Sequence, residues 1–159
     1  MKCSLPIAAI LLIGSAPGCG DDDSDGTHSG HGGSGTQASC GAGPLHLGDT
    51  ATSDDGTFTV ELVEADPMPS EKFENDWTVR ILTADGEPFT SMESLEVTPW
   101  MPDHAHDGQV PPELGEMDDT GTLQVDRINL WMAGLWDVYF DVTHDGVQER
   151  ATLSLCIED

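Results

Sequence analysis

The chain has 159 residues, a length that suits one domain of common size and leaves little room for a second. It carries five Lys and Arg residues against 30 Asp and Glu residues, which gives a net charge of -25. A field of this sign repels the phosphates of nucleic acids, so we expect no nucleic-acid partner. A disordered chain is also excluded, because apolar residues recur with the period of β-strands from Phe58 onward.

Residues 1–18 are predicted to be a signal peptide rather than part of the fold. The segment has a short N-terminal region with Lys2, continues with an apolar run from Leu5 to Ile13 and ends in small residues before Cys19. The run is too short for a permanent membrane-spanning helix and has the pattern of a secretory signal. We therefore expect export of the chain, with Cys3 lost in the signal.

The sequence SAPGC at residues 15–19 resembles a bacterial lipobox, in which the cysteine becomes the lipidated first residue of the mature protein. Lipid on Cys19 would anchor the chain to a membrane of the bacterial cell envelope. Pro17 departs from the usual small-residue pattern, so secretion without lipid is the alternative. Residue 20 is Gly and not the Asp that retains some lipoproteins, which favours the outer membrane and leaves open which side of it the domain faces.

Residues 19–39 are predicted to be a lipidated Cys19 followed by a disordered tether. The stretch is rich in Gly, Ser and Asp and has no large apolar residue, so it cannot bury enough surface to order itself. A coil of this length spans roughly 25 Å. His28 and His31 lie in the tether and are interpreted as part of a solvated spacer, with weak metal binding as the alternative.

Two cysteines, Cys40 and Cys156, remain after the signal and the lipid site are set aside. An even number of remaining cysteines in an exported protein predicts a disulfide. A thiolate metal site is the competing interpretation, but an oxidising compartment and the lack of a Cys-x-x-Cys pair argue against it. Cys156 has the opposite strand parity to Leu153 and Leu155, so the bridge should lie on the outside of the last strand.

Six segments between the tether and the chain end alternate apolar and polar residues with a period of two. They are TFTVELVEA at 57–65, DWTVRILTA at 76–84, ESLEVTPW at 93–100, GTLQVDRI at 121–128, LWDVYFDVT at 135–143 and ERATLSLCI at 149–157. PLHLGDTA at 44–51 is a weaker seventh, and turn sequences such as THDGV at 143–147 separate the strands. Residues 40–159 are therefore predicted to form an all-β, immunoglobulin-like antiparallel β-sandwich of about seven strands, with Trp136 in its core.

Three stretches of this domain resemble the YtkA-like domain family, which is related to FixH-type proteins. They are DWTVRILTADGEPFT at 76–90, VTPWMPDHAHD at 97–107 and INLWMAGLWDVYFDV at 128–142. They contain a Met-Pro-x-His-x-His turn followed by a Met-x-Gly-x-Trp segment, in the family's order, but Ala105 and Asp107 stand where the family usually has Gly. The resemblance implies an immunoglobulin-like sandwich in an exported or membrane-associated bacterial protein. Some relatives are encoded with or fused to heavy-metal transport and copper-related proteins, which makes copper handling the implied function.

The residues of the motif suggest metal chemistry by themselves. His104 and His106 are two apart, and in an extended segment both imidazoles would point the same way. Met101 precedes them, and Met132 should lie in a loop at an end of the sandwich, from which it could approach His104. Imidazole nitrogen with thioether sulfur favours copper over structural zinc. Asp103 and Asp107 could orient an imidazole through its second nitrogen.

The alternative is a structural turn whose histidines cap backbone groups and whose methionines pack on neighbouring aromatic rings. On that interpretation the domain is an interaction module for an envelope protein partner, and we would expect an exposed aromatic patch around Trp100 and Trp131. A ligand other than copper also stays open. Catalysis has little support, because the chain has neither a Gly-x-Ser-x-Gly sequence nor a phosphate-cradling Gly loop. We therefore expect a binding protein and no enzyme.

Overall fold

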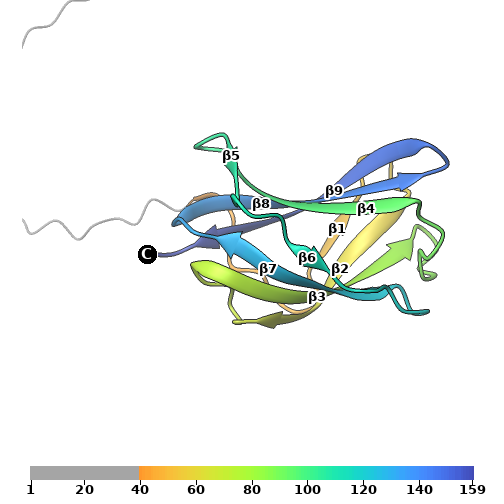
Figure 1. The fold of residues 1–159 in the computed structure, drawn as a ribbon, viewed down its shortest axis with the longest axis horizontal. Coiled ribbons are helices and arrows are strands. Elements are labelled where there is room, and N and C mark those ends of the chain that lie inside the picture. The colour runs from red at the N-terminus through yellow and green to blue at the C-terminus, as the bar shows by residue number, and fades with distance from the viewer. Residues whose placement is uncertain (1–39) are drawn as a thin grey trace, which may run out of the picture. The chain divides into compact units, whose positions relative to one another are not determined.

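The computed structural model describes residues 40–159, and this part of the chain is built of β-strands in two antiparallel sheets (Figure 1). The predicted signal peptide at 1–18, lipidated Cys19 and the tether with His28 and His31 lie outside the described residues. No helix within residues 40–159 has the length and apolar character that crossing a bilayer requires.

Seven of the strands in this range correspond to the seven predicted ones. They are β1 (Thr50–Thr52), β2 (Phe58–Asp66), β3 (Phe73–Thr83), β4 (Ser94–Met101), β7 (Thr122–Leu130), β8 (Gly134–His144) and β9 (Val147–Ile157). Two further strands of two residues each, β5 (His106–Asp107) and β6 (Glu113–Leu114), lie between β4 and β7, where no strand was predicted. The weak first strand is shorter than expected, because the chain turns at Gly48 before pairing with β2.

The two sheets have the orders β1-β2-β3-β7-β6 and β5-β4-β8-β9. The predicted all-β antiparallel sandwich is thus confirmed. The long β8–β9 hairpin has a two-residue turn in which Asp145 and Gly146 have φ angles of 51° and 73°. Positive φ at both positions matches the twist of the flanking strands, which is why Asp-Gly occurs in such turns. The chain between β5 and β6 crosses from one sheet to the other (Figure 1).

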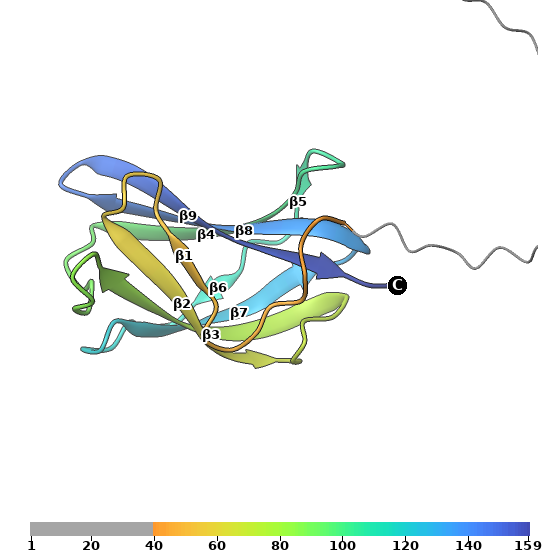
Figure 2. The same ribbon diagram turned by 180° about the vertical axis from the view of Figure 1, so that it is seen from behind.

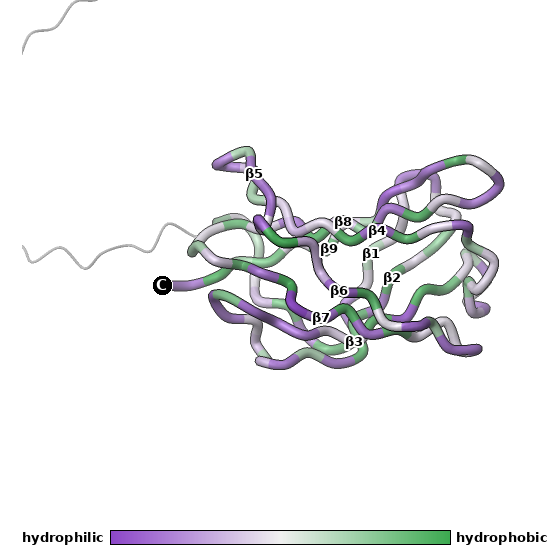
Figure 3. The backbone as a smooth tube through the Cα atoms, viewed as in Figure 1, coloured by the Kyte–Doolittle hydropathy of each residue, from purple (hydrophilic) through white to green (hydrophobic). Residues whose placement is uncertain are grey.

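The core lies between the sheets and is formed by alternate residues of the long strands. Trp77, Trp136, Phe58 and Phe140 are its largest fully buried side chains. Trp136 has no exposed surface, as predicted. Hydrophilic residues gather at the hairpin ends and apolar ones recur along the strands (Figure 3). Burial of alternate faces explains why the period-two pattern identified these strands.

The predicted disulfide joins Cys40 to Cys156, with 5.9 Å between their Cα atoms. Cys156 is half-buried between the buried Leu155 and Ile157, so the bridge lies on the outer face of β9 as expected. The N–H of Cys156 also donates to the carbonyl of Gly43, which holds the incoming chain beside β9 (Figure 2). Core, sheets and disulfide all lie within residues 40–159, and this part of the chain therefore has the parts of an independent folding unit.

Candidate metal centre

The Met-Pro-x-His-x-His segment forms a tight turn that joins β4 to β5. The N–H groups of His104 and Ala105 both donate to the carbonyl of Met101, at 3.2 and 2.9 Å. Ala105 has a φ of 53°, in the left-handed region that favours Gly. The expected extended segment is therefore wrong: His104 lies in the turn and His106 in the strand that follows. The imidazoles of His104 and His106 are therefore not brought together by the alternation of side chains along one strand.

The structure pairs His106 instead with Met101, its cross-strand partner in the β4–β5 hairpin. Directly opposed residues of an antiparallel pair point to the same face, with Cβ atoms about 5 Å apart. Met101 is 1% exposed, and it belongs to the core as well as to the motif. The thioether of Met101 and the imidazole of His106 thus start from neighbouring positions on the inward face of the hairpin.

Gly134 connects this hairpin to the Met-x-Gly-x-Trp segment. A Cβ at position 134 would lie 2.6 Å from the methyl carbon of Met101, and the residue has a φ of 133°. Both the contact and the backbone angle favour Gly there. The two motifs that were recognised separately in the sequence therefore meet in space, with the side chain of Met101 packed against the backbone of Gly134.

The imidazole of His106 is held by one hydrogen bond and two aromatic rings. Its Nδ1 lies 2.9 Å from the carbonyl oxygen of Asp107, an arrangement that places the proton on Nδ1 and leaves Nε2 as an acceptor. The ring stacks on Trp131, with centroids 4.9 Å apart, and meets the edge of Trp136 at 5.9 Å. Nε2 is buried, and within the described residues it has no hydrogen-bond partner.

The nitrogen that orients the His106 ring is Nδ1, and its partner is a backbone carbonyl. The sequence had suggested the carboxylate of Asp103 or Asp107 for this role. The Asp107 carboxylate instead accepts a hydrogen bond from the N–H of Gln109 at 2.9 Å. A carbonyl that fixes one imidazole nitrogen and leaves the other free is a common support for a metal-binding histidine.

His104 is exposed, and its ring centroid is 5.8 Å from that of His106. The turn therefore brings the two rings near each other although the segment is not extended. His104 lies on the solvent side of His106, where it could join a metal that is already bound to the more buried ring.

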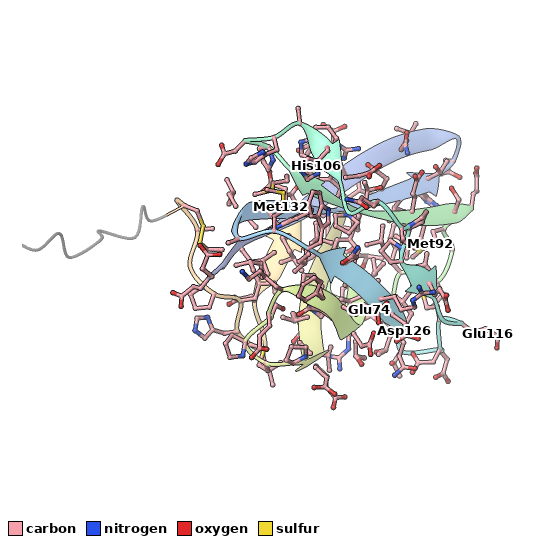
Figure 4. All side chains as sticks on the ribbon, turned by 60° about the vertical axis from the view of Figure 1, so that its left-hand side comes forward. Glu74, Met92, His106, Glu116, Asp126 and Met132 are labelled. Atoms are coloured by element: carbon pink, nitrogen blue, oxygen red, sulfur yellow. A yellow bond between two sulfur atoms is a disulfide. The ribbon has the colours of Figure 1, made fainter. Side chains whose placement is uncertain are left out.

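Met132 lies in the β7–β8 connection, at the same end of the sandwich as His106 (Figure 4). It is half-buried and packs against the core. Its carbonyl accepts a hydrogen bond from the indole Nε1 of Trp136 at 2.9 Å, which fixes the backbone of this connection. Met132 is thus held by the core residue that ends the Met-x-Gly-x-Trp segment.

The chemistry available at this end is one half-buried imidazole, one exposed imidazole and thioether sulfur. Across residues 40–159, no three side chains of His, Cys, Asp or Glu gather where they could hold a metal ion. A metal here would therefore depend on the sulfur atoms of Met101 and Met132. The arrangement has no set of carboxylates that would suit a hard cation such as calcium or magnesium.

The net charge of the domain favours the binding of a cation. Removing Lys2 and the four aspartates before Cys40 leaves four basic and 26 acidic residues in the described range. Each of the four basic side chains already forms an ion pair: Lys72 with Asp159, Arg80 with Glu61, Arg127 with Glu74 and Glu113, and Arg150 with Asp141. No positive side chain of residues 40–159 is therefore left to oppose the approach of a metal ion.

Trp131 is the residue of the candidate site that sequence reasoning missed. It was considered only as a ring for methionine to pack on, or as part of an exposed patch. In the structure Trp131 is half-buried and stacks on His106. Trp100 is half-buried as well, so these two residues do not form the exposed aromatic patch that was expected of an interaction module. The only signal in the sequence was the position of Trp131 directly before Met132.

Comparison with known proteins gave one result. The family model described as YtkA-like matches residues 52–141, which include the last residue of β1, all of β2 to β7 and most of β8. No curated protein and no solved structure matched the chain. The matched range contains the Met-Pro-x-His-x-His turn, Trp131 and the Met-x-Gly-x-Trp segment, and so all of the candidate metal centre.

Proposed function

The chain belongs to the YtkA-like family, and from this premise we propose that its sandwich is a non-catalytic Cu(I)-binding domain of the bacterial cell envelope. His106 would be the central ligand, with sulfur from Met101 and Met132, and His104 would complete the site from the solvent side. The role is that of binding and handing on copper, without a catalysed reaction.

One observation carries the proposal: the Nε2 atom of His106 is buried, and in the described part of the chain nothing hydrogen-bonds to it. A buried polar atom without a partner costs about 1–3 kcal/mol and is uncommon in native proteins. A bound metal ion would satisfy this nitrogen. The cost is understandable if the domain holds the imidazole ready for a metal.

The donor types point to Cu(I). Thioether sulfur is a poor ligand for hard cations and a good one for Cu(I), and imidazole suits copper as well. Cys40 and Cys156 are joined to each other, so they offer no thiolate that would favour zinc. The rings of Trp131 and Trp136 flank His106 and keep water from that side of the imidazole.

The envelope location is part of the same proposal. Lipid on Cys19 would anchor the chain, preferentially to the outer membrane, and residues 20–39 would hold the domain clear of the surface. Replacing Cys19 by Ser should move the protein from the membrane fraction to the soluble fraction, and mass spectrometry of the mature N-terminus should show the lipid only in the wild type. A wild-type N-terminus without lipid would support plain secretion.

The copper proposal is tested by anaerobic titration of residues 20–159 with Cu(I) against a colorimetric chelator, with ascorbate as reductant to spare the disulfide. Met101→Leu and Met132→Leu remove sulfur while conserving volume, a change that usually costs less than about 1.5 kcal/mol. We expect one tightly bound Cu(I) in the wild type, weaker binding in both methionine variants and none in His106→Phe. His46→Ala is the matched control, because His46 is exposed and lies outside the cluster.

If the wild type and His106→Phe compete equally well with the chelator for Cu(I), the result contradicts the proposal. The Met-Pro-x-His-x-His turn would then be a structural element, in which His106 serves to pack on Trp131 and the methionines serve the core.

A further inference from the structure

Strand β4 has a free edge over most of its length. One side pairs with β8 from Ser94 to Trp100, whereas on the other side β5 pairs only with Trp100 and Met101. The last contact on that side is the N–H of Gly108 donating to the carbonyl of Pro99 at 3.0 Å. Among the described residues, no strand lies beside β4 from Ser94 to Thr98 on this side.

The direction of the free backbone groups follows from Pro99. Its carbonyl faces the β5 side, and alternate residues of an antiparallel strand send their N–H and C=O groups to the same side. The N–H and C=O groups of Leu95 and Val97 therefore face the free edge. They are the groups that an added strand would pair with.

A groove runs along this edge. The chain leaves β4 at Asp107 and crosses to β6 on the other sheet (Figure 1), and between this crossing and β4 lies a space of about 310 Å³. Its apolar lining includes Leu95, Val97, Val110 and Leu114. Val110 and Leu114 are 43% and 39% exposed, so this part of the apolar lining is open to solvent.

The other long edge of this sheet is protected, in contrast to β4. On β9 the N–H of Asp54 donates to the carbonyl of Arg150, and the N–H of Cys156 donates to the carbonyl of Gly43. The disulfide holds the same segment in place. Proteins usually guard edge strands against pairing with other chains, so an edge left free beside an apolar groove is a candidate for binding an extended segment.

The charge of the rim specifies the partner. Glu96 and Asp107 are among the residues that line the groove, and neither carboxylate forms an ion pair within residues 40–159. The described residues include 26 acidic and four basic ones, so a second copy of this chain would be repelled. A basic segment would be attracted, and its apolar side chains could enter the groove.

We propose that the free edge of β4 binds an extended, basic segment of a partner protein by strand addition. The segment pairs with the backbone of Leu95 and Val97, directs alternate apolar side chains towards Val110 and Leu114, and directs its lysines or arginines towards Glu96 and Asp107. This proposal is independent of copper, since His106 does not line the groove.

The test uses residues 20–159 and a fluorescent peptide of alternating valine and lysine, measured by anisotropy at physiological salt. The same peptide with N-methyl groups on one backbone edge keeps its charge and loses its strand pairing. We expect N-methylation to weaken binding on the order of tenfold, since more than one backbone hydrogen bond is lost. The matching peptide with glutamate in place of lysine should not bind.

Two measurements on the protein complete the test. Amide hydrogen exchange should be fast at Leu95 and Val97 in the free domain and slow in the complex. Val97→Pro, which removes an N–H that faces the free edge as Pro99 already does, should weaken binding by a similar factor while the domain stays folded. Binding that N-methylation leaves unchanged, or exchange at Leu95 and Val97 that stays fast in the complex, would overturn strand addition. Slow exchange at these amides in a peptide-free dimer would assign the edge to a second copy and would also overturn it.

Discussion

Met101 and His106 are cross-strand partners in the β4–β5 hairpin, one 1% exposed and the other half-buried against Trp131. This relationship places a thioether and an imidazole on the same inward face. It makes one end of the sandwich both part of the core and a candidate site for copper.

His106→Phe should keep the fold and remove the site. Phenylalanine can stack on Trp131, and it removes a buried nitrogen that within the described residues has no partner. We expect the free energy of unfolding without copper to equal the wild-type value or exceed it by about 1 kcal/mol. Thermal or urea unfolding measures this. A loss of several kcal/mol would show that His106 is needed for stability. It would then contradict the idea that the domain keeps an unpaired imidazole nitrogen for a metal at a cost in stability.

Gly134→Ala should disturb the packing of Met101, and with it the β4–β5 hairpin. The new Cβ would meet the methyl of Met101, and the φ of 133° is unfavourable for Ala, so we expect a loss of about 1–3 kcal/mol. Met101→Ala opens space for the added Cβ. The double mutant should therefore lose less stability than the sum of the two single mutants. Strict additivity in urea unfolding would contradict the contact.

Ala105→Gly should stabilise the domain. Ala105 has a φ of 53°, in a region that costs a residue with a Cβ roughly 1–2 kcal/mol, part of which is offset by the greater freedom of Gly in the unfolded chain. We expect a net gain of about 0.5–1 kcal/mol and little change in copper affinity. Ala84→Gly is the control, because Ala84 lies in a turn and has no positive φ. A destabilising Ala105→Gly would show that the turn has another conformation.

Glu149 should make stability depend on pH in the acidic range. The hydroxyl of Thr57 donates to its carboxylate, the hydroxyl of Ser53 also donates to it, and these hydrogen bonds hold the pKa of Glu149 below its ordinary value of 4.5. A lowered pKa in the folded state adds stability that is fully present above the unfolded pKa and is lost as the pH falls through the folded pKa.

The stability difference between wild type and Glu149→Gln should therefore be constant above about pH 5 and should shrink as the pH falls below 4.5. Glu158→Gln removes the same charge from an exposed position at the chain end and controls for the overall change in charge. Urea unfolding across this pH range measures both. A difference that grows with acidity would contradict the assigned hydrogen bonds.

The sequence was sufficient to predict the strands, because each long strand buries one face and so shows a period of two. It also predicted the disulfide on the outside of β9, since Cys156 differs in parity from its buried neighbours. The short strands β5 and β6 could not be predicted: each has two residues, too few for a periodic pattern, and forms only through pairing with β4 or β7.

The candidate site was predicted in composition but not in geometry. Residue spacing suggested that an extended segment brings His104 and His106 together. In the structure a turn at Ala105 brings the two rings near each other instead, and the hairpin register pairs His106 with Met101. The register of the β4–β5 hairpin and the stacking of His106 on Trp131 depend on tertiary contacts. The local sequence shows no periodic pattern from which these contacts could be predicted. The groove beside β4 was not predicted for the same reason, because it is formed by a crossing between the two sheets.

X-ray absorption spectroscopy of the Cu(I)-loaded domain tests the central claim most directly, since it identifies the atoms bound to the metal. We predict a copper shell that contains both nitrogen and sulfur, with sulfur scattering reduced in Met101→Leu and in Met132→Leu and the metal absent from His106→Phe. A shell of nitrogen and oxygen alone, unchanged in the two methionine variants, would contradict a site built on His106, Met101 and Met132.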